Sequence, residues 1–160
     1  MTAAPLLEVR DLRVAYARDG AWRSVVNGVS FDVHAGETVA LVGESGCGKT
    51  AIALSLMRLL ARNGRIESGS AVRFEGHDLL ALGERAMCDL RGRRLAMIFQ
   101  EPASALNPVM TVGEQVAEVA RLHGRPSRRE AWQRAVAMLE RTGIARAAER
   151  AKQYPHELSG

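Results

Sequence analysis

Residues 43–50 read Gly-Glu-Ser-Gly-Cys-Gly-Lys-Thr, and this stretch restricts the possible folds more than any other part of the chain. It fits G-x-x-x-x-G-K-[ST], the pattern of a loop that binds phosphate groups between a strand and a helix. The preceding residues 38–42 form a short apolar run typical of a buried strand, and Ile52, Leu56 and Leu60 follow at helical spacing. The sequence therefore predicts a strand, a phosphate-binding loop and a helix in direct succession.

Each fixed position of the loop has a chemical reason. Gly43, Gly46 and Gly48 allow the backbone to turn tightly and to bring its N–H groups against phosphate oxygens. A helix that starts near Gly48 adds unpaired N–H groups and the positive end of its dipole. Lys49 is expected to reach the β and γ phosphates, and the Thr50 hydroxyl is expected to bind Mg²⁺. The other predicted nucleotide contacts in the loop are Glu44, Ser45 and Cys47. The alternative is a glycine-rich turn before an ordinary helix, which the flanking patterns disfavour.

Composition limits the class of protein. The chain has 160 residues, of which 47% are hydrophobic and 25% charged, and these proportions are typical of one globular domain. Cys47 and Cys88 form no C-x-x-C pair, so neither a disulfide framework nor a zinc site is predicted, and a reducing cytosol fits. We expect neither a membrane span nor a signal peptide, because no long uncharged apolar run occurs.

Charge does not favour nucleic acid as a partner. The net charge is +4, but the arginines are interleaved with acidic residues along the chain. The densest basic groups, within 91–94 and 125–129, are predicted to be solvated faces. Cys47 lies beside the cation Lys49 and near a predicted helix N-terminus, where a thiol reacts more readily, although a small residue tolerated at that position is the simpler interpretation.

Hydrophobic periodicity divides the chain into a β-rich first part and a helical second part. Alternating residues predict strands over 7–16, with a kink near Arg10-Asp11, over 29–33 and over 72–74, which together form an antiparallel layer. The apolar run 95–99 predicts a strand buried on both faces of a parallel sheet. Helices are predicted over 112–124, over 127–141 with a capping box from Ser127 to Glu130, and around 145–152. A short helix is expected within 78–91.

Three further features make the chain resemble an ATP-binding cassette (ABC) ATPase of the oligopeptide, dipeptide and nickel importer subfamily. Tyr16 falls where that family places an aromatic residue that stacks on adenine. Gln100, at the end of its apolar run, resembles the family's Q-loop glutamine, which reaches Mg²⁺ or the attacking water. Leu158, Ser159 and Gly160 resemble the start of the LSGGQ signature. Taken singly, a tyrosine at a strand end is more often packing and a glutamine there a polar terminus.

The resemblance covers essentially the whole chain and implies an α/β fold. It implies a P-loop NTPase of the ABC ATPase type, with an N-terminal antiparallel β layer, a partial parallel core sheet and a helical subdomain. Residues 1–160 would form the N-terminal portion of one nucleotide-binding domain. Within it, residues 1–100 would hold the β layer and P-loop core, and residues 101–160 the helical subdomain up to the start of the signature.

The resemblance also implies a function. The protein would bind ATP and Mg²⁺ and couple ATP hydrolysis to import of peptides or a related small solute, with nickel as an open alternative. Its partners would be a second ATPase protomer, as homodimer or heterodimer, transmembrane permease subunits and, indirectly, a substrate-binding protein. It would lie at the cytoplasmic face of the membrane as a peripheral subunit.

The family's remaining catalytic parts find no match in these 160 residues. The Walker B strand, the catalytic Glu and the switch His are missing, and His156 fits a structural role. The resemblance implies that Lys49 and Gln100 contribute to catalysis and that Thr50 and Gln100 bind Mg²⁺, but the catalytic set is incomplete. We therefore expect the chain as given to bind nucleotide weakly and not to hydrolyse it. The alternatives are a non-catalytic nucleotide-binding fragment and a soluble P-loop phosphotransferase. The phosphotransferase alternative leaves Gln100 and residues 158–160 unexplained.

Overall fold

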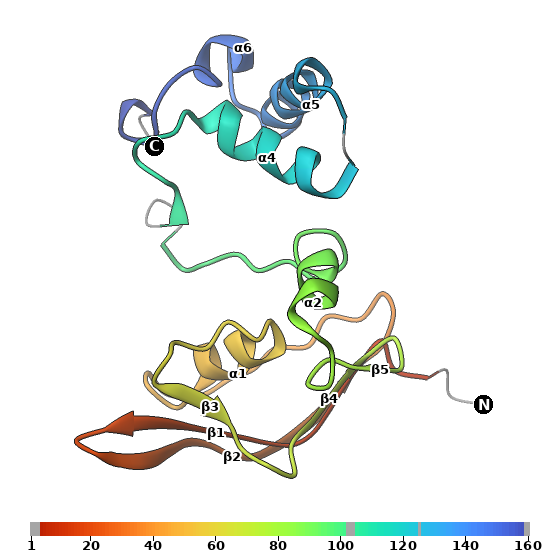
Figure 1. Ribbon diagram of the computed structural model, residues 1–160, viewed down its shortest axis with the longest axis vertical. Helices are drawn as coiled ribbons and strands as arrows, with labels where there is room; N and C mark the ends of the chain where they lie inside the picture. Colours follow the sequence, from red (N-terminus) through yellow and green to blue (C-terminus); the bar gives the residue numbers. More distant parts are fainter. Residues whose placement is uncertain (1–3, 102–104, 125, 159–160) are drawn as a thin grey trace. The chain divides into compact units, whose positions relative to one another are not determined.

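The computed structural model describes residues 4–101, 105–124 and 126–158 (Figure 1). The chain divides into two compact units, residues 1–91 and residues 92–160. The division of one nucleotide-binding domain at residue 100 remains a prediction.

The first unit is built on an antiparallel sheet. Its strands are β1 (Leu7–Arg18), β2 (Ala21–Val33), β3 (Gly64–Ile66), β4 (Ala71–Phe74) and β5 (His77–Asp78). The order is β2-β1-β4-β5, and β3 pairs with β1 beyond the end of β4. Every pairing is antiparallel, which confirms the predicted β layer.

The long β1–β2 hairpin follows the local sequence signals closely. The register shifts between Val9 and Leu12, and Asp11 has a φ of 45°, which confirms the kink predicted near this point. Asp19 and Gly20 both have positive φ and form the turn. The second strand starts at Ala21 instead of residue 29, because the tight turn returns the chain directly into pairing with β1.

Helix α1 (Lys49–Leu56) lies over β1 and β2, and α2 (Glu84–Leu90) follows the sheet (Figure 1). The helical pattern of the sequence continues to Leu60, but α1 ends at Leu56 and Arg58 takes a φ of 50°. The interior of this unit is formed by large side chains from the sheet and from the segment around α2. The fully buried ones are Val9, Leu12, Val14, Val72, Leu79 and Met87.

Arg91 joins α1 to α2, so its predicted place on a solvated face is wrong. Its Nε donates to the Met57 carbonyl at 2.8 Å and its Nη2 to the Arg58 carbonyl at 3.2 Å. Its Nη1 pairs with the Glu84 carboxylate, and only 17% of its side chain is exposed. These bonds satisfy carbonyl groups just beyond the last turn of α1, which has no basic residue of its own.

The second unit is helical. It contains α4 (Val112–Gly124), α5 (Arg128–Arg141), α6 (Ala147–Arg150) and a 3-10 turn (Pro155–Glu157). The capping box predicted at the start of α5 is present, since Ser127 Oγ accepts from the Glu130 N–H at 3.3 Å and Glu130 Oε2 accepts from the Ser127 N–H at 2.9 Å. Val112 and Leu139 form the core with Ala147 and Ala151.

The two strands predicted for a parallel core sheet are not formed. In the described part of the chain, residues 38–42 and 95–99 belong to no strand. Val42 is 94% exposed and Ile98 91% exposed. A central strand needs a neighbour on each edge for its N–H and C=O groups, and neither segment joins a sheet within the described residues. Leu95 forms only a single bridge, in the tight turn where its carbonyl accepts from the Gly92 N–H at 2.8 Å. The apolar runs indicate segments suited to burial, but the sequence pattern does not specify the neighbouring strands that would bury them.

Candidate phosphate-binding loop

The predicted phosphate loop leads into the N-terminus of α1 on the surface of the first unit. Residues 43–47 are exposed, and Gly48 is the N-cap residue with a φ of 97°. Among the residues that the structure describes, no side chain caps this end of the helix. Because a helix leaves its first N–H groups without internal partners, the loop presents donors to the solvent.

Four backbone N–H groups at neighbouring positions of this loop can donate a hydrogen bond to a ligand. Those of Gly46, Gly48, Lys49 and Thr50 bond to no acceptor within the described residues, whereas the Cys47 N–H donates to the Glu44 carbonyl at 3.3 Å. Successive free donors at a helix N-terminus, together with the helix dipole, attract an anion. The loop therefore has the donors that an anion such as a phosphate group requires.

The glycines of the loop have different structural roles. A Cβ at Gly48 would lie 2.9 Å from the Val25 carbonyl oxygen and 3.1 Å from Val26 Cγ2, so this glycine lets the loop pack against β2. A Cβ at Gly43 would lie 2.6 Å from Cys47 Sγ. Gly46 has a φ of 82° and open space where a Cβ would be. The loop is thus packed at both ends and open in the middle.

Lys49 holds the two ends of the loop together. Its Nζ donates to the carbonyl oxygens of Gly43 at 2.8 Å and Glu44 at 2.7 Å, and it lies 3.5 Å from Cys47 Sγ. Both oxygen acceptors are neutral, and a charged phosphate oxygen accepts a stronger bond from an ammonium group. Lys49 can therefore turn from the carbonyls to a bound phosphate.

Thr50 fits the predicted role toward Mg²⁺. It is exposed, and its hydroxyl has no hydrogen bond within the described residues. Mg²⁺ prefers oxygen ligands and is often held by few protein groups together with substrate phosphates and water. In the described part of the chain, no group of three or more His, Cys, Asp or Glu side chains could hold a metal ion by itself. A magnesium ion here would thus depend on the nucleotide.

The other predicted site residues lie at different places. Tyr16 is half-buried near the end of β1, in the same unit as the loop. Gln100 is exposed in the second unit, so its approach to the loop stays a prediction. Leu158 packs against the helical core, while Ser159 and Gly160 lie outside the described residues. His156 stacks on Tyr154 with ring centroids 5.7 Å apart, consistent with a structural role.

Sequence reasoning missed the amide that organises the turn after Gln100. Gln115 Oε1 accepts from the Asn107 N–H at 2.8 Å, and Gln115 Nε2 donates to the Asn107 carbonyl at 2.9 Å and the Met110 carbonyl at 3.0 Å. Neither periodicity nor a known short motif links residues eight positions apart across a turn. The turn that contains Asn107 is therefore fixed to α4 by a side chain whose contacts only the structure reveals.

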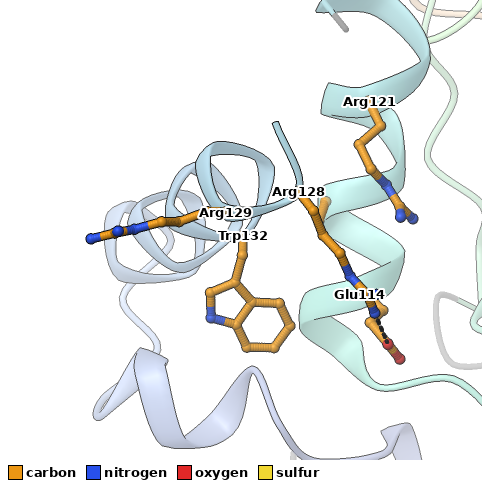
Figure 2. A pocket seen from close by; sticks show the side chains of 6 residues that line it. Glu114, Arg121, Arg128, Arg129 and Trp132 are labelled. Carbon is orange, nitrogen blue, oxygen red and sulfur yellow. Dashed lines mark ion pairs between the residues drawn. The ribbon is translucent and has the colours of Figure 1, made fainter. Parts of the chain in front are cut away.

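A pocket of about 460 Å³ opens between α4 and α5 (Figure 2). It is lined by Glu114, Ala117, Arg121, Arg128, Arg129 and Trp132. Arg128 pairs with Glu114 at 3.9 Å and is 87% exposed. The Trp132 ring packs on the helical core, where a Cβ at Gly113 would lie 2.7 Å from its Cη2. This surface agrees with the solvated basic face predicted for residues 125–129, of which Arg125 lies outside the described residues.

Comparison with known proteins places these features in a family. The ABC transporter family model matches residues 26–160. A probable peptide ABC transporter ATP-binding protein of Sinorhizobium fredii is 47% identical over 155 residues, which are 97% of this chain and 46% of that protein. A Brucella melitensis protein described as a peptide import ATP-binding protein is 48% identical over 166 residues, covering 100% of this chain and 49% of its own length. The chain thus spans about half the length of the curated relatives it matches.

Solved structures share the fold. A dimeric bacterial ABC transporter cassette and a dimeric ATP-binding cassette with ADP and Pi each match with a TM-score of 0.80 at 20% identity, over 96% of this chain and 63% of theirs. This likeness confirms the P-loop NTPase fold of the ABC ATPase type. Among the described residues, no helix has the length and apolar character to cross a membrane. Because the family model covers the phosphate loop, Gln100 and the residues up to 160, this chain belongs to the ABC transporter family.

Proposed function

We propose that this protein binds ATP together with Mg²⁺ at residues 43–50 and that the complete cassette couples ATP hydrolysis to the import of peptides. The observation that carries the proposal is the set of free N–H groups at Gly46, Gly48, Lys49 and Thr50. Lys49 supplies the mobile positive charge, and Thr50 the magnesium ligand. Peptides are the proposed cargo, rather than nickel, because the relatives quoted above are described as peptide transporter or peptide import proteins.

The residues outside the loop have supporting roles in this proposal. Tyr16 stacks on the adenine ring, and Gln100 reaches Mg²⁺ or the attacking water. Phosphoryl transfer depends mainly on positioning and on neutralising charge, which Lys49, Thr50 and Gln100 would supply in part. A carboxylate that activates the attacking water is not among the residues identified in this chain, so we propose nucleotide binding, and not turnover, for residues 1–160 alone.

The proposed assembly follows from the incomplete site. A second ATPase protomer would contribute its signature to the nucleotide bound here, and the segment beginning at Leu158 would serve the partner in the same way. Both similar solved structures are described as dimeric, which supports this arrangement. Permease subunits would hold the pair at the cytoplasmic face of the membrane, with a substrate-binding protein delivering the peptide.

Calorimetric titration with ATP and Mg²⁺ tests the binding step. We expect Lys49→Ala to weaken binding about 10- to 150-fold, because a hydrogen bond to a charged group contributes about 1.5–3 kcal/mol. Lys152→Ala is the matched control, since Lys152 is the only other lysine and belongs to the second unit. Equal binding by the two variants would refute the proposed role of the loop.

A further inference from the structure

Gly64 lies directly against the ring of Tyr16. A Cβ at Gly64 would lie 2.7 Å from Tyr16 Cε1, and 3.1 Å from both Cδ1 and Cζ. Contacts below 3.0 Å are not tolerated without a shift of one partner, so no residue with a side chain fits here while the ring keeps its position. The φ of Gly64 is not in the left-handed region, so the restriction comes from the ring alone.

These three distances also show which side of the ring Gly64 covers. Cδ1 and Cζ are the two ring atoms bonded to Cε1, and both are only slightly farther from the built Cβ than Cε1 is. A point in the plane of the ring, outside Cε1, would be much farther from both neighbours than from Cε1. The Cβ position therefore lies above the ring, and the glycine covers one aromatic face.

Strand pairing fixes this contact. Tyr16 and Gly64 are directly opposite each other in the antiparallel β1–β3 ladder. The Tyr16 side chain and a Cβ built at Gly64 therefore point to the same face of the sheet. The Ala17 N–H donates to the Asn63 carbonyl at 2.7 Å, and the Gly64 N–H donates to the Ala61 carbonyl at 2.7 Å. Because the backbone on both sides of Gly64 is bonded, the ring meets a firm surface.

We propose that Gly64 is a positioning residue for the base of the bound nucleotide. By lacking a side chain, it lets the Tyr16 ring lie across β3 with one face covered by backbone. The ring is half-buried, so its remaining surface is available to the base. This inference rests on the proposed function, in which Tyr16 stacks on adenine. It adds that the contact with Gly64 in β3 determines the orientation of the ring, and with it the affinity for the base.

A purely structural role of the same contact makes a different prediction. An aromatic ring folded over a glycine in a neighbouring strand also stabilises a sheet. If that were all, Gly64→Ala would affect every ligand of the unit equally through loss of folded protein. If Gly64 positions the base contact, the loss is confined to ligands that contain the base.

The test compares ATP with inorganic tripolyphosphate, which offers the phosphate loop its ligand without a base. Affinities are measured by calorimetry with Mg²⁺ for the unchanged protein, Tyr16→Ala, Gly64→Ala and the double variant. We expect Tyr16→Ala to weaken ATP binding about 5- to 150-fold, the range for loss of one stacked base. Gly64→Ala should weaken ATP binding in the same direction and leave tripolyphosphate affinity unchanged. In the Tyr16→Ala background, Gly64→Ala should have no further effect on ATP.

Gly83→Ala is the matched control, because Gly83 belongs to the same unit, has a φ of −66° and has open space at its Cβ position. It should change neither affinity. The inference is overturned if Gly64→Ala lowers both affinities equally, or if it still weakens ATP binding without Tyr16. If Tyr16→Ala leaves ATP affinity unchanged, the base contact and this inference both fail, while the Lys49→Ala result still decides the phosphate site independently.

Discussion

Two glycines of the phosphate loop should respond very differently to the same substitution. Gly46 and Gly48 both have left-handed φ values, 82° and 97°, so alanine at either position costs about 1–2 kcal/mol in backbone strain. At Gly46 the added methyl group meets open space. At Gly48 it would meet the Val25 carbonyl oxygen at 2.9 Å and Val26, which is buried, so overpacking adds about 1–3 kcal/mol. We expect Gly48→Ala to destabilise the first unit by about 2–5 kcal/mol.

The chain provides a convenient reporter for this measurement. It has two tryptophans, Trp22 in the first unit and Trp132 in the second. In a Trp132→Phe background, urea unfolding followed by fluorescence reports on the first unit alone. The free energy of unfolding should fall by about 1–3 kcal/mol more for Gly48→Ala than for Gly46→Ala. Equal losses would refute the packing role of Gly48, and a larger loss for Gly46→Ala would reverse the assignment of the open and packed positions.

Three further substitutions test ligand binding by the loop and the stability of each unit. Gly46→Ala, although mild in its effect on stability, should weaken binding of ATP with Mg²⁺, because the methyl group enters the open middle of the loop; calorimetry would show this, and unchanged affinity would contradict it. Arg91→Ala should destabilise the first unit by about 1–3 kcal/mol, because partly buried carbonyl acceptors lose their donor, whereas the exposed Arg93→Ala should be neutral in the same urea experiment. Hydrogen bonds from the backbone N–H and hydroxyl of Ser127 hold the pKa of Glu130 below its ordinary value of 4.5, so the capping box stabilises α5 fully above pH 4.5 and less as the pH falls through the lowered pKa. Glu130→Gln should therefore lower the stability of the second unit at pH 7 and differ less from the unchanged protein at low pH, and a difference independent of pH would contradict this.

Local signals were sufficient for much of the fold. The phosphate loop, the Asp19-Gly20 turn and the capping box at Ser127 depend on residues within a few positions of one another. Their residue types determine the backbone conformation directly, through positive φ or through a side chain that bonds the nearby backbone. The kink near Arg10-Asp11 and the capping box were predicted from the sequence and are present in the structure, and the turn has the positive φ values that its residue types allow. The family resemblance also rested on such short motifs.

Contacts between distant segments could not be predicted in this way. Arg91 belongs to a basic group in the sequence, yet it bonds carbonyls more than thirty positions earlier. The apolar runs 38–42 and 95–99 predict burial, but pairing depends on neighbours that composition does not specify. Gly64 and Tyr16 lie far apart in the sequence, and only the β1–β3 register reveals that they face each other.

Whether the free backbone N–H groups of the loop hold the phosphates of ATP can be tested residue by residue. Nuclear magnetic resonance of the ¹⁵N-labelled protein follows each backbone amide during titration with ATP and Mg²⁺. The amide signals of Gly46, Gly48, Lys49 and Thr50 should show the largest shifts, and tripolyphosphate should shift the same four. ATP binding that leaves these four signals in place would show that other groups hold the phosphates.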